Sequence, residues 1–209
     1  WLAPGTTATT SVAGIPLDIG TTNRAGARSG PAAIRAASRM LVDGDHPTAR
    51  RDPSASLADA GDFAIALGDL PASLARVEQQ ADAHPHLVSL GGEHGITLPL
   101  LRALRRRHAA PLGLLVFDAH VDTWPDNFGQ PLGHGSVFFH AINEGLVDPR
   151  RMVQLGIRSP VQNDVMDWTL AQGVTVIDAI AIHESTPTAI AARAAAVLGP
   201  EPAYLSFDI

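Results

Sequence analysis

The chain has 209 residues, of which 45% are hydrophobic and 17% are charged, and this composition predicts a globular protein with a packed core. A formal net charge of −6 excludes the broad positive surface that nucleic-acid binding requires, and no apolar run is long enough to cross a membrane. The absence of cysteine excludes disulfides and thiolate metal sites, and because the first residues also lack the pattern of a signal peptide, we expect a cytoplasmic protein.

Segments of helical pattern alternate with short apolar runs along the chain. Such alternation predicts βαβ units, in which helices connect parallel strands. The length suits one domain, so we expect a single α/β domain over residues 1–209 with a mainly parallel central sheet. In chain order, the predicted elements are a strand at 11–19, a helix at 30–41, a loop at 42–62, a helix at 70–83, a strand at 86–94, a helix at 96–109, a strand at 112–120, a helix at 136–146, strands at 151–158 and 173–179, a helix at 186–199 and a strand at 203–209.

Histidine and aspartate residues stand where several predicted strands end. His94 closes "LVSLGGEH", Asp118, His120 and Asp122 follow the apolar run of "LLVFDAHVDTW", and Asp208 closes "YLSFD". In open parallel sheets, ligands bind outside the carboxyl ends of the strands. We therefore expect five oxygen or nitrogen donors to gather at one edge of one sheet.

The chemistry of these donors indicates a metal site. Carboxylates with imidazoles and no thiolates favour Mn, Zn, Fe, Co or Ni over Ca. Several carboxylates in a partly buried site repel one another unless a cation neutralises them, and bridging carboxylates suit two ions held about 4 Å apart. The alternative for a single Asp at a strand end is a cap or turn residue. The set of Asp118, His120 and Asp122 therefore carries the prediction.

Taken together, these pieces resemble the ureohydrolase family of arginases and agmatinases, and they are most similar to its agmatinase-like members. "RAGARSGPAAIR" (24–35) is similar to the family's N-terminal glycine–arginine loop, and "GGEHGITLPLL" resembles its Gly-Gly-Asp-His segment. "FDAHVDT" resembles the Asp-Ala-His-x-Asp signature, and "YLSFDI" resembles the start of the Ser-x-Asp-x-Asp signature. "GHGSVFFHAINEGLVDPRRMVQLGIR" looks like the agmatinase version of the next segment.

The resemblance implies a three-layer α/β/α fold and a dimanganese hydrolase, with Ni²⁺, Co²⁺ or Zn²⁺ as alternative ions. By motif, His94 and Asp122 would bind one metal ion and His120 the other, while Asp118 and Asp208 would bridge the two. The family hydrolyses a guanidino group to an amine and urea, and its members form trimers or hexamers. The resemblance thus implies a small guanidino substrate and a homo-oligomer.

Two catalytic residues are also implied by the resemblance. Asp122 would accept or relay a proton, and His134 in "GHG" matches the family histidine that exchanges protons with the leaving group or bulk water. Trp124 stands where arginases have an Asn that binds the substrate's α-carboxylate, so we expect agmatine, giving putrescine for polyamine biosynthesis, rather than arginine. We expect the loop 124–135 to line the substrate tail, with Asp126 and Asn127 as contacts.

The family pattern continues beyond Ile209 with a second Asp, so we expect this domain to be truncated at its C-terminus, with the C-terminal part of the fold missing, and inactive as a fragment. Within the same family, guanidinobutyrate, another guanidino acid or a small guanidine is the alternative substrate. A non-catalytic subunit is a second alternative. A mononuclear zinc deacetylase is a third, which the absence of any His-His pair disfavours.

Overall fold

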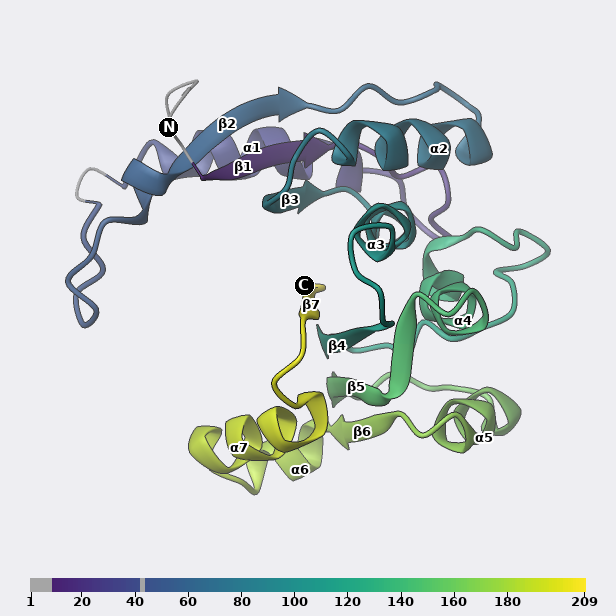
Figure 1. Ribbon diagram of the computed structural model, residues 1–209. Coiled ribbons are helices and arrows are strands. Elements are labelled where there is room, and N and C mark those ends of the chain that lie inside the picture. Colours follow the sequence, from purple (N-terminus) through teal and green to yellow (C-terminus); the bar gives the residue numbers. More distant parts are fainter. Residues whose placement is uncertain (1–8, 42–43) are drawn as a thin grey trace. The chain divides into compact units, whose positions relative to one another are not determined.

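The computed structural model describes residues 9–41 and 44–209 (Figure 1). The chain forms two compact units that divide between Leu100 and Leu101. Every strand pairing in both units is parallel, which confirms the predicted α/β class. No helix in the described ranges is long and apolar enough to cross a lipid bilayer. The expectation of a single domain over 1–209 stays a prediction.

The first unit contains a three-stranded sheet in the order β2-β1-β3, and its described residues include the helices α1 and α2. Asp69 caps the second helix, because its side chain accepts a hydrogen bond from the N–H of Ala72 at 2.9 Å. That helix buries Leu70, Leu74 and Val77. The elements are β1 (Thr10–Ile15), α1 (Gly30–Ser38), β2 (Leu57–Asp62), α2 (Leu70–Ala81) and β3 (Leu87–Gly91).

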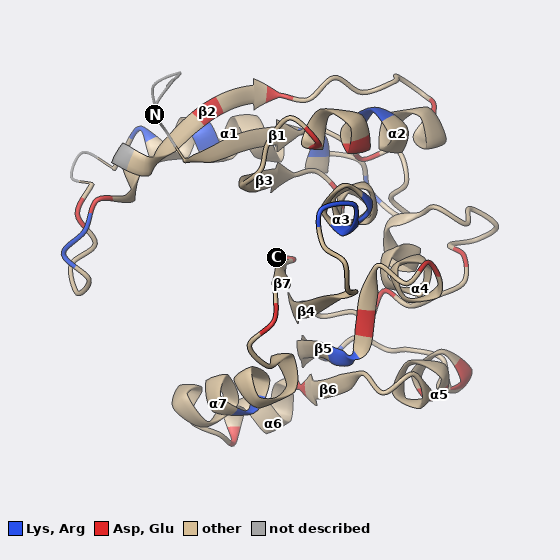
Figure 2. Cartoon of the chain, viewed as in Figure 1, with Lys and Arg blue, Asp and Glu red and all other residues tan. Residues whose placement is uncertain are grey.

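Strand β2 was not predicted, because its residues lie in the segment 42–62, which was expected to be a loop. Residues 42 and 43 of that segment lie outside the described residues. The sequence "LADAGD" lacks the β-branched and aromatic residues that favour strands. Ion pairs hold the strand instead: the guanidinium of Arg35 in α1 donates to both carboxylate oxygens of Asp59, at 3.0 and 2.9 Å, and also pairs with Asp62. Figure 2 shows acidic positions in red on β2 and a basic position in blue on α1.

The second unit contains a four-stranded parallel sheet in the order β6-β5-β4-β7. Helix α3 (Thr97–Arg105) runs across the division between the units. A 3-10 helix at His134–Ser136 precedes α4. The remaining elements are β4 (Leu112–Phe117), α4 (Val137–Asn143), β5 (Val147–Ile157), α5 (Asn163–Ala171), β6 (Thr175–Asp178), α6 (Ala179–His183), α7 (Pro187–Leu198) and β7 (Ala203–Phe207).

Helices cover both faces of this second sheet (Figure 1). On one face, Val153 and Leu155 of β5 form a cluster with residues of α6 and α7. On the other face, Ile157 joins a cluster with Val165 of α5. Ile157 changes face because the pairing of β5 with β6 shifts register between Leu155 and Ile157, where Gly156 adopts a φ of 95°.

Helix α5 was not predicted. Only Val165 and Thr169 of its nine residues are fully buried, so its apolar periodicity is too short to stand out in the sequence. The predicted strand at 173–179 is shorter than expected, because Asp178 caps α6 by accepting a hydrogen bond from the N–H of Ala181 at 2.7 Å.

Candidate metal centre

Two of the predicted ligands follow neighbouring strands directly. Phe117 of β4 is paired with Phe207 of β7, so Asp118 and Asp208 are the next residues along two adjacent parallel strands. The N–H of Asp208 donates to the carbonyl of Phe117 at 2.8 Å, and the N–H of Asp118 donates to the carbonyl of Leu155 at 3.0 Å. The parallel register therefore brings the two carboxylates to the same edge of the sheet.

Asp122 reaches this edge through a turn. The sequence predicted a strand that continues to residue 120, but β4 ends at Phe117. Along an extended strand, residues four apart would be separated by about 13 Å. Asp122 instead has a φ of 46°, a left-handed conformation that Asp tolerates better than most residues. The turn folds the chain back and leaves Asp122 only 4% exposed.

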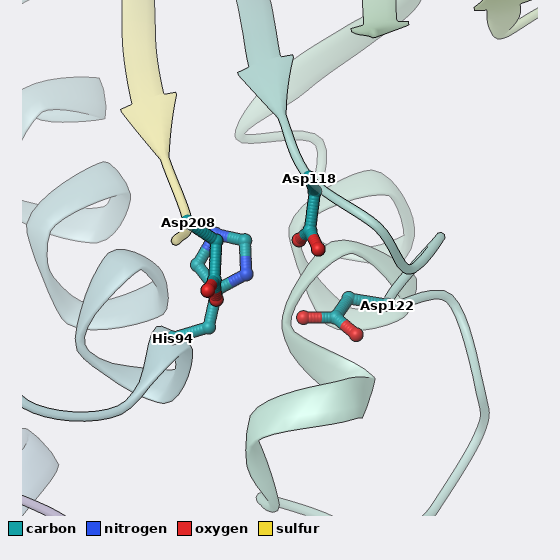
Figure 3. A group of neighbouring side chains, drawn as sticks. All are labelled: His94, Asp118, Asp122 and Asp208. Atoms are coloured by element: carbon teal, nitrogen blue, oxygen red, sulfur yellow. The ribbon is translucent and has the colours of Figure 1, made fainter. Parts of the chain in front are cut away.

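Four of the five predicted metal ligands form one group, in which each residue offers one ligand atom and all four atoms lie within 4.8 Å of one another (Figure 3). Asp118, Asp122 and Asp208 belong to the second unit, and His94 lies in the 3-10 helix His94–Ile96 that directly precedes α3. Figure 3 shows the carboxylates of Asp118 and Asp208 leaving the ends of their strands. Whether these residues bind a metal ion stays a prediction.

His120 is not a member of that group. Its side chain is 55% exposed, and its ring Nδ1 lies 3.4 Å from Oδ1 of Asp118, which also accepts the backbone N–H of His120 at 2.8 Å. His134, the predicted proton shuttle, is half-buried at the first position of the 3-10 helix before α4.

The donor set fits the predicted ions. One imidazole nitrogen and three carboxylate oxygens, without sulfur, suit Mn, Zn, Fe, Co or Ni. Asp118 and Asp122 are each only 4% exposed, so water screens their charges poorly. Three carboxylates at this separation repel one another, and a divalent cation among them removes that repulsion.

The sequence did not reveal a second group of acidic residues, which lies within the first unit. Asp18 is 2% exposed and forms an ion pair with Arg28, and that guanidinium holds the pKa of Asp18 below its usual range. Burial raises the pKa of Glu93 to about 7, and the charge of Asp18 adds to the rise, although Oε2 of Glu93 accepts the N–H of Gly20 at 2.8 Å. Glu93, which directly precedes His94, thus holds Gly20 in the glycine-rich loop after β1, and Asp18 holds Gly26 and Arg28 of the same loop.

The predicted substrate loop is built by its own polar side chains. Asp126 accepts the N–H of Gly129 at 2.8 Å, and Asn127 accepts the hydroxyl of Ser136 at 3.0 Å. The first hydrogen bond lies within the loop and the second ties the loop to the 3-10 helix at its end, so the structure gives both residues a role in shaping it. The loop presents Phe128 at its tip with a φ of 53° and 95% of the residue exposed.

Trp124 is partly buried in the cluster of the second unit that contains Val121 and Val165. Its indole N–H donates to Oε1 of Gln162 at 3.2 Å. The ring therefore supplies packing at the start of the loop, at the position where the resemblance expects arginases to have a polar contact.

Comparisons with known proteins agree with this architecture. A family model described as the arginase family matches residues 8–209. An agmatinase from Serratia proteamaculans is 38% identical over 205 residues, which are 95% of this chain and 64% of that relative. The chain therefore spans less than two thirds of the length of that curated relative.

Solved structures share the fold. A hypothetical agmatinase from Burkholderia thailandensis superposes with a TM-score of 0.86 at 37% identity, over 96% of this chain and 63% of that one. The proclavaminate amidino hydrolase of Streptomyces clavuligerus also gives a TM-score of 0.86, at 32% identity, over 95% of this chain and 67% of that one. The α/β fold, the carboxylates at the strand ends and the match over residues 8–209 together place this chain in the arginase family.

Proposed function

We propose that the protein is a ureohydrolase that converts agmatine to putrescine and urea with two manganese ions. The observation that carries the proposal is the group of His94, Asp118, Asp122 and Asp208, whose ligand atoms lie within 4.8 Å of one another. The similarity to a protein named agmatinase, at 38% identity, supports the choice of substrate. Nickel, cobalt or zinc are the alternative ions, because oxygen and nitrogen donors of this kind accept several first-row metals.

The proposed ligand assignment follows the arrangement of the side chains. Asp118 and Asp208 follow paired positions of adjacent strands and are suited to bridge two ions. His94 and Asp122 would complete the coordination of one ion, and His120, whose Nδ1 lies 3.4 Å from Oδ1 of Asp118, would complete that of the other. When bound, two divalent ions supply a lowered pKa for water at neutral pH and Lewis-acid polarisation of the substrate.

The chain's own residues then handle charge and protons. Hydrolysis joins the oxygen of water to the guanidinium carbon and breaks the bond between that carbon and the alkyl-bearing nitrogen. Asp122 is buried beside the other carboxylates and accepts a proton from the attacking water. His134, half-buried at the start of its 3-10 helix, donates a proton to the departing amine.

Substrate choice rests on the loop 124–135. The indole N–H of Trp124 is used by Gln162, so it does not serve a substrate α-carboxylate, which disfavours arginine. Guanidinobutyrate and related guanidino compounds remain the alternative substrates.

We also propose that the protein is cytoplasmic and assembles as a homo-oligomer, either a trimer or a hexamer. Light scattering on the purified protein measures the oligomeric state.

The test is urea release from a panel of agmatine, guanidinobutyrate, guanidinopropionate, guanidine and arginine by the manganese-loaded full-length protein, with metal counted on the same sample. Two ions per chain and urea from agmatine are the expected result. Urea release from another compound of the panel would show that this compound, and not agmatine, is the substrate, and the proposed reaction type would stand. Two ions without urea from any of them would rule out ureohydrolysis, and no bound ion would favour the non-catalytic subunit.

A further inference from the structure

A buried amide side chain holds the backbone next to Asp122. Gln154 lies in β5, is 0% exposed, and donates a hydrogen bond of 2.6 Å from Nε2 to the carbonyl oxygen of Val121. That carbonyl belongs to the peptide group that joins Val121 to Asp122. Because the φ of Asp122 is the rotation that immediately follows this peptide group, fixing its plane fixes the starting point of the left-handed turn at 46°.

Backbone hydrogen bonds hold the rest of the turn. The carbonyl of Ala119 accepts the N–H groups of Arg158 and Ser159, both at 3.0 Å. The carbonyl of Asp122 accepts the N–H of Phe138 at 2.9 Å. Between these two anchors, the hydrogen bond that the structure shows for the carbonyl of Val121 comes from the side chain of Gln154. A change at position 154 therefore alters the support of this turn without removing any backbone hydrogen bond.

In the part of the chain that the structure describes, the amide oxygen of Gln154 does not contribute a hydrogen bond that would stabilise the fold. Oε1 of Gln154 is buried, and no described residue offers it a hydrogen bond. Exchanging the amide oxygen and nitrogen would place two oxygens 2.6 Å apart, so the orientation is fixed by Val121. A buried acceptor without a donor is unfavourable, and an apolar side chain of the same length would avoid that penalty. The amide at this position is thus better explained by what its N–H groups hold than by the stability it provides.

We propose that Gln154 is a positioning residue of the metal centre, which acts by orienting the peptide group before Asp122 so that the Asp122 carboxylate faces Asp118 and Asp208. The role in metal binding rests on the function proposed above, whereas the role in holding the turn does not. Partners that orient metal ligands typically change metal affinity by about 10–100-fold when they are removed.

The test compares Gln154→Met with Ser73→Ala in the complete protein. Methionine matches the length of glutamine and removes the donor to Val121, and Gln154→Leu repeats the change with a shorter side chain. Ser73 is 0% exposed in α2, and its hydroxyl bonds to the backbone of Ala66. Ser73→Ala therefore removes both hydrogen bonds of a buried hydroxyl far along the chain from the turn and serves as the control for a general loss of stability.

Two measurements are made on each variant. The first is amide hydrogen exchange at Phe138 in metal-free protein, because this amide donates to Asp122 and reports the position of the turn. The second is the dissociation constant for Mn²⁺ from titration followed by electron paramagnetic resonance. In Gln154→Met we expect faster exchange at Phe138, about 10–100-fold weaker Mn²⁺ binding and a melting temperature close to that of the unmodified protein. Ser73→Ala should lower the melting temperature and leave both other readouts unchanged.

The outcomes separate this inference from the proposed function. If the unmodified protein binds no Mn²⁺, the metal function fails, and the exchange rate at Phe138 still decides whether Gln154 holds the turn. A folded Gln154→Met protein with unchanged exchange, or with unchanged Mn²⁺ binding where the unmodified protein binds it, would overturn the inference. Failure of both Gln154 variants to fold would overturn it too, because it would show that the side chain serves stability.

Discussion

A pair of buried hydroxyls, one of them on the residue that follows Asp122, gives a prediction about stability. Both the size of the effect and the difference between the two single substitutions follow from the direction of the hydrogen bond. Thr123 and Thr169 are 1% and 0% exposed, and their oxygens lie 2.6 Å apart. The hydroxyl of Thr169 donates its one hydrogen to the carbonyl of Val165 at 2.8 Å, so Thr123 must be the donor to Thr169. Replacing Thr169 by Val removes that acceptor and leaves the Thr123 hydroxyl buried without a partner, at a cost of about 2 kcal/mol.

Replacing Thr123 by Val removes only one of the two hydrogen bonds and leaves Thr169 bonded to Val165, so its expected cost is about 1 kcal/mol. The double variant should cost less than the sum, because no hydroxyl remains unpaired. Thermal unfolding measures the difference, since 2 kcal/mol corresponds to a fall in the melting temperature of about 4–8 °C for a chain of this size. A larger loss for Thr123→Val than for Thr169→Val, or full additivity in the double variant, would refute the assigned directions.

Three further predictions concern the centre and its surroundings. Because burial raises the pKa of Glu93 to about 7, the carboxyl favours the folded state when protonated and loses that advantage as pH rises through 7; Glu93→Gln should therefore raise the melting temperature at pH 8 more than at pH 5. Asp122→Asn should lower urea release by at least about 100-fold and weaken Mn²⁺ binding, and full turnover with both ions would contradict its assignment. Gly156→Ala should lower the melting temperature, because φ is 95° there and the new Cβ would lie 3.2 Å from the carbonyl oxygen of Asp118; an unchanged value would show that the bulge relaxes.

Much of the fold could be predicted from the sequence because it depends on local patterns. The apolar run "LGLLVF" predicts a buried strand, and the structure has β4 there. The missed elements lack such patterns. β2 is held by the ion pairs that Arg35 makes with Asp59 and Asp62, which are separated from Arg35 in sequence and cannot be inferred from local propensity. α5 buries only two residues and so gives no clear periodicity.

The sequence named candidate site residues, but it did not predict the backbone conformation that brings them together. The motifs identified His94, Asp118, Asp122 and Asp208, and the structure groups them. The sequence predicted a strand over 112–120, whereas the strand ends at Phe117 and a left-handed turn brings Asp122 into the group. Nothing in the sequence indicated the support from Gln154, because that contact depends on which face of β5 lies behind the turn.

The order of the strands in the second sheet has a consequence for how the centre forms during folding. β4 pairs with β7, and the chain between them builds β5, β6 and the four helices α4 to α7 before β7 is reached. Closing a loop of that length is entropically costly, so contacts distant in sequence form slowly. Asp122 can be held by β5 and α4 early in folding, whereas Asp208 takes its position only when the strand before it joins the sheet. A cation that binds during synthesis, before β7 pairs with β4, would therefore lack Asp208 as a ligand. It would dissociate faster from this incomplete site than from the complete one.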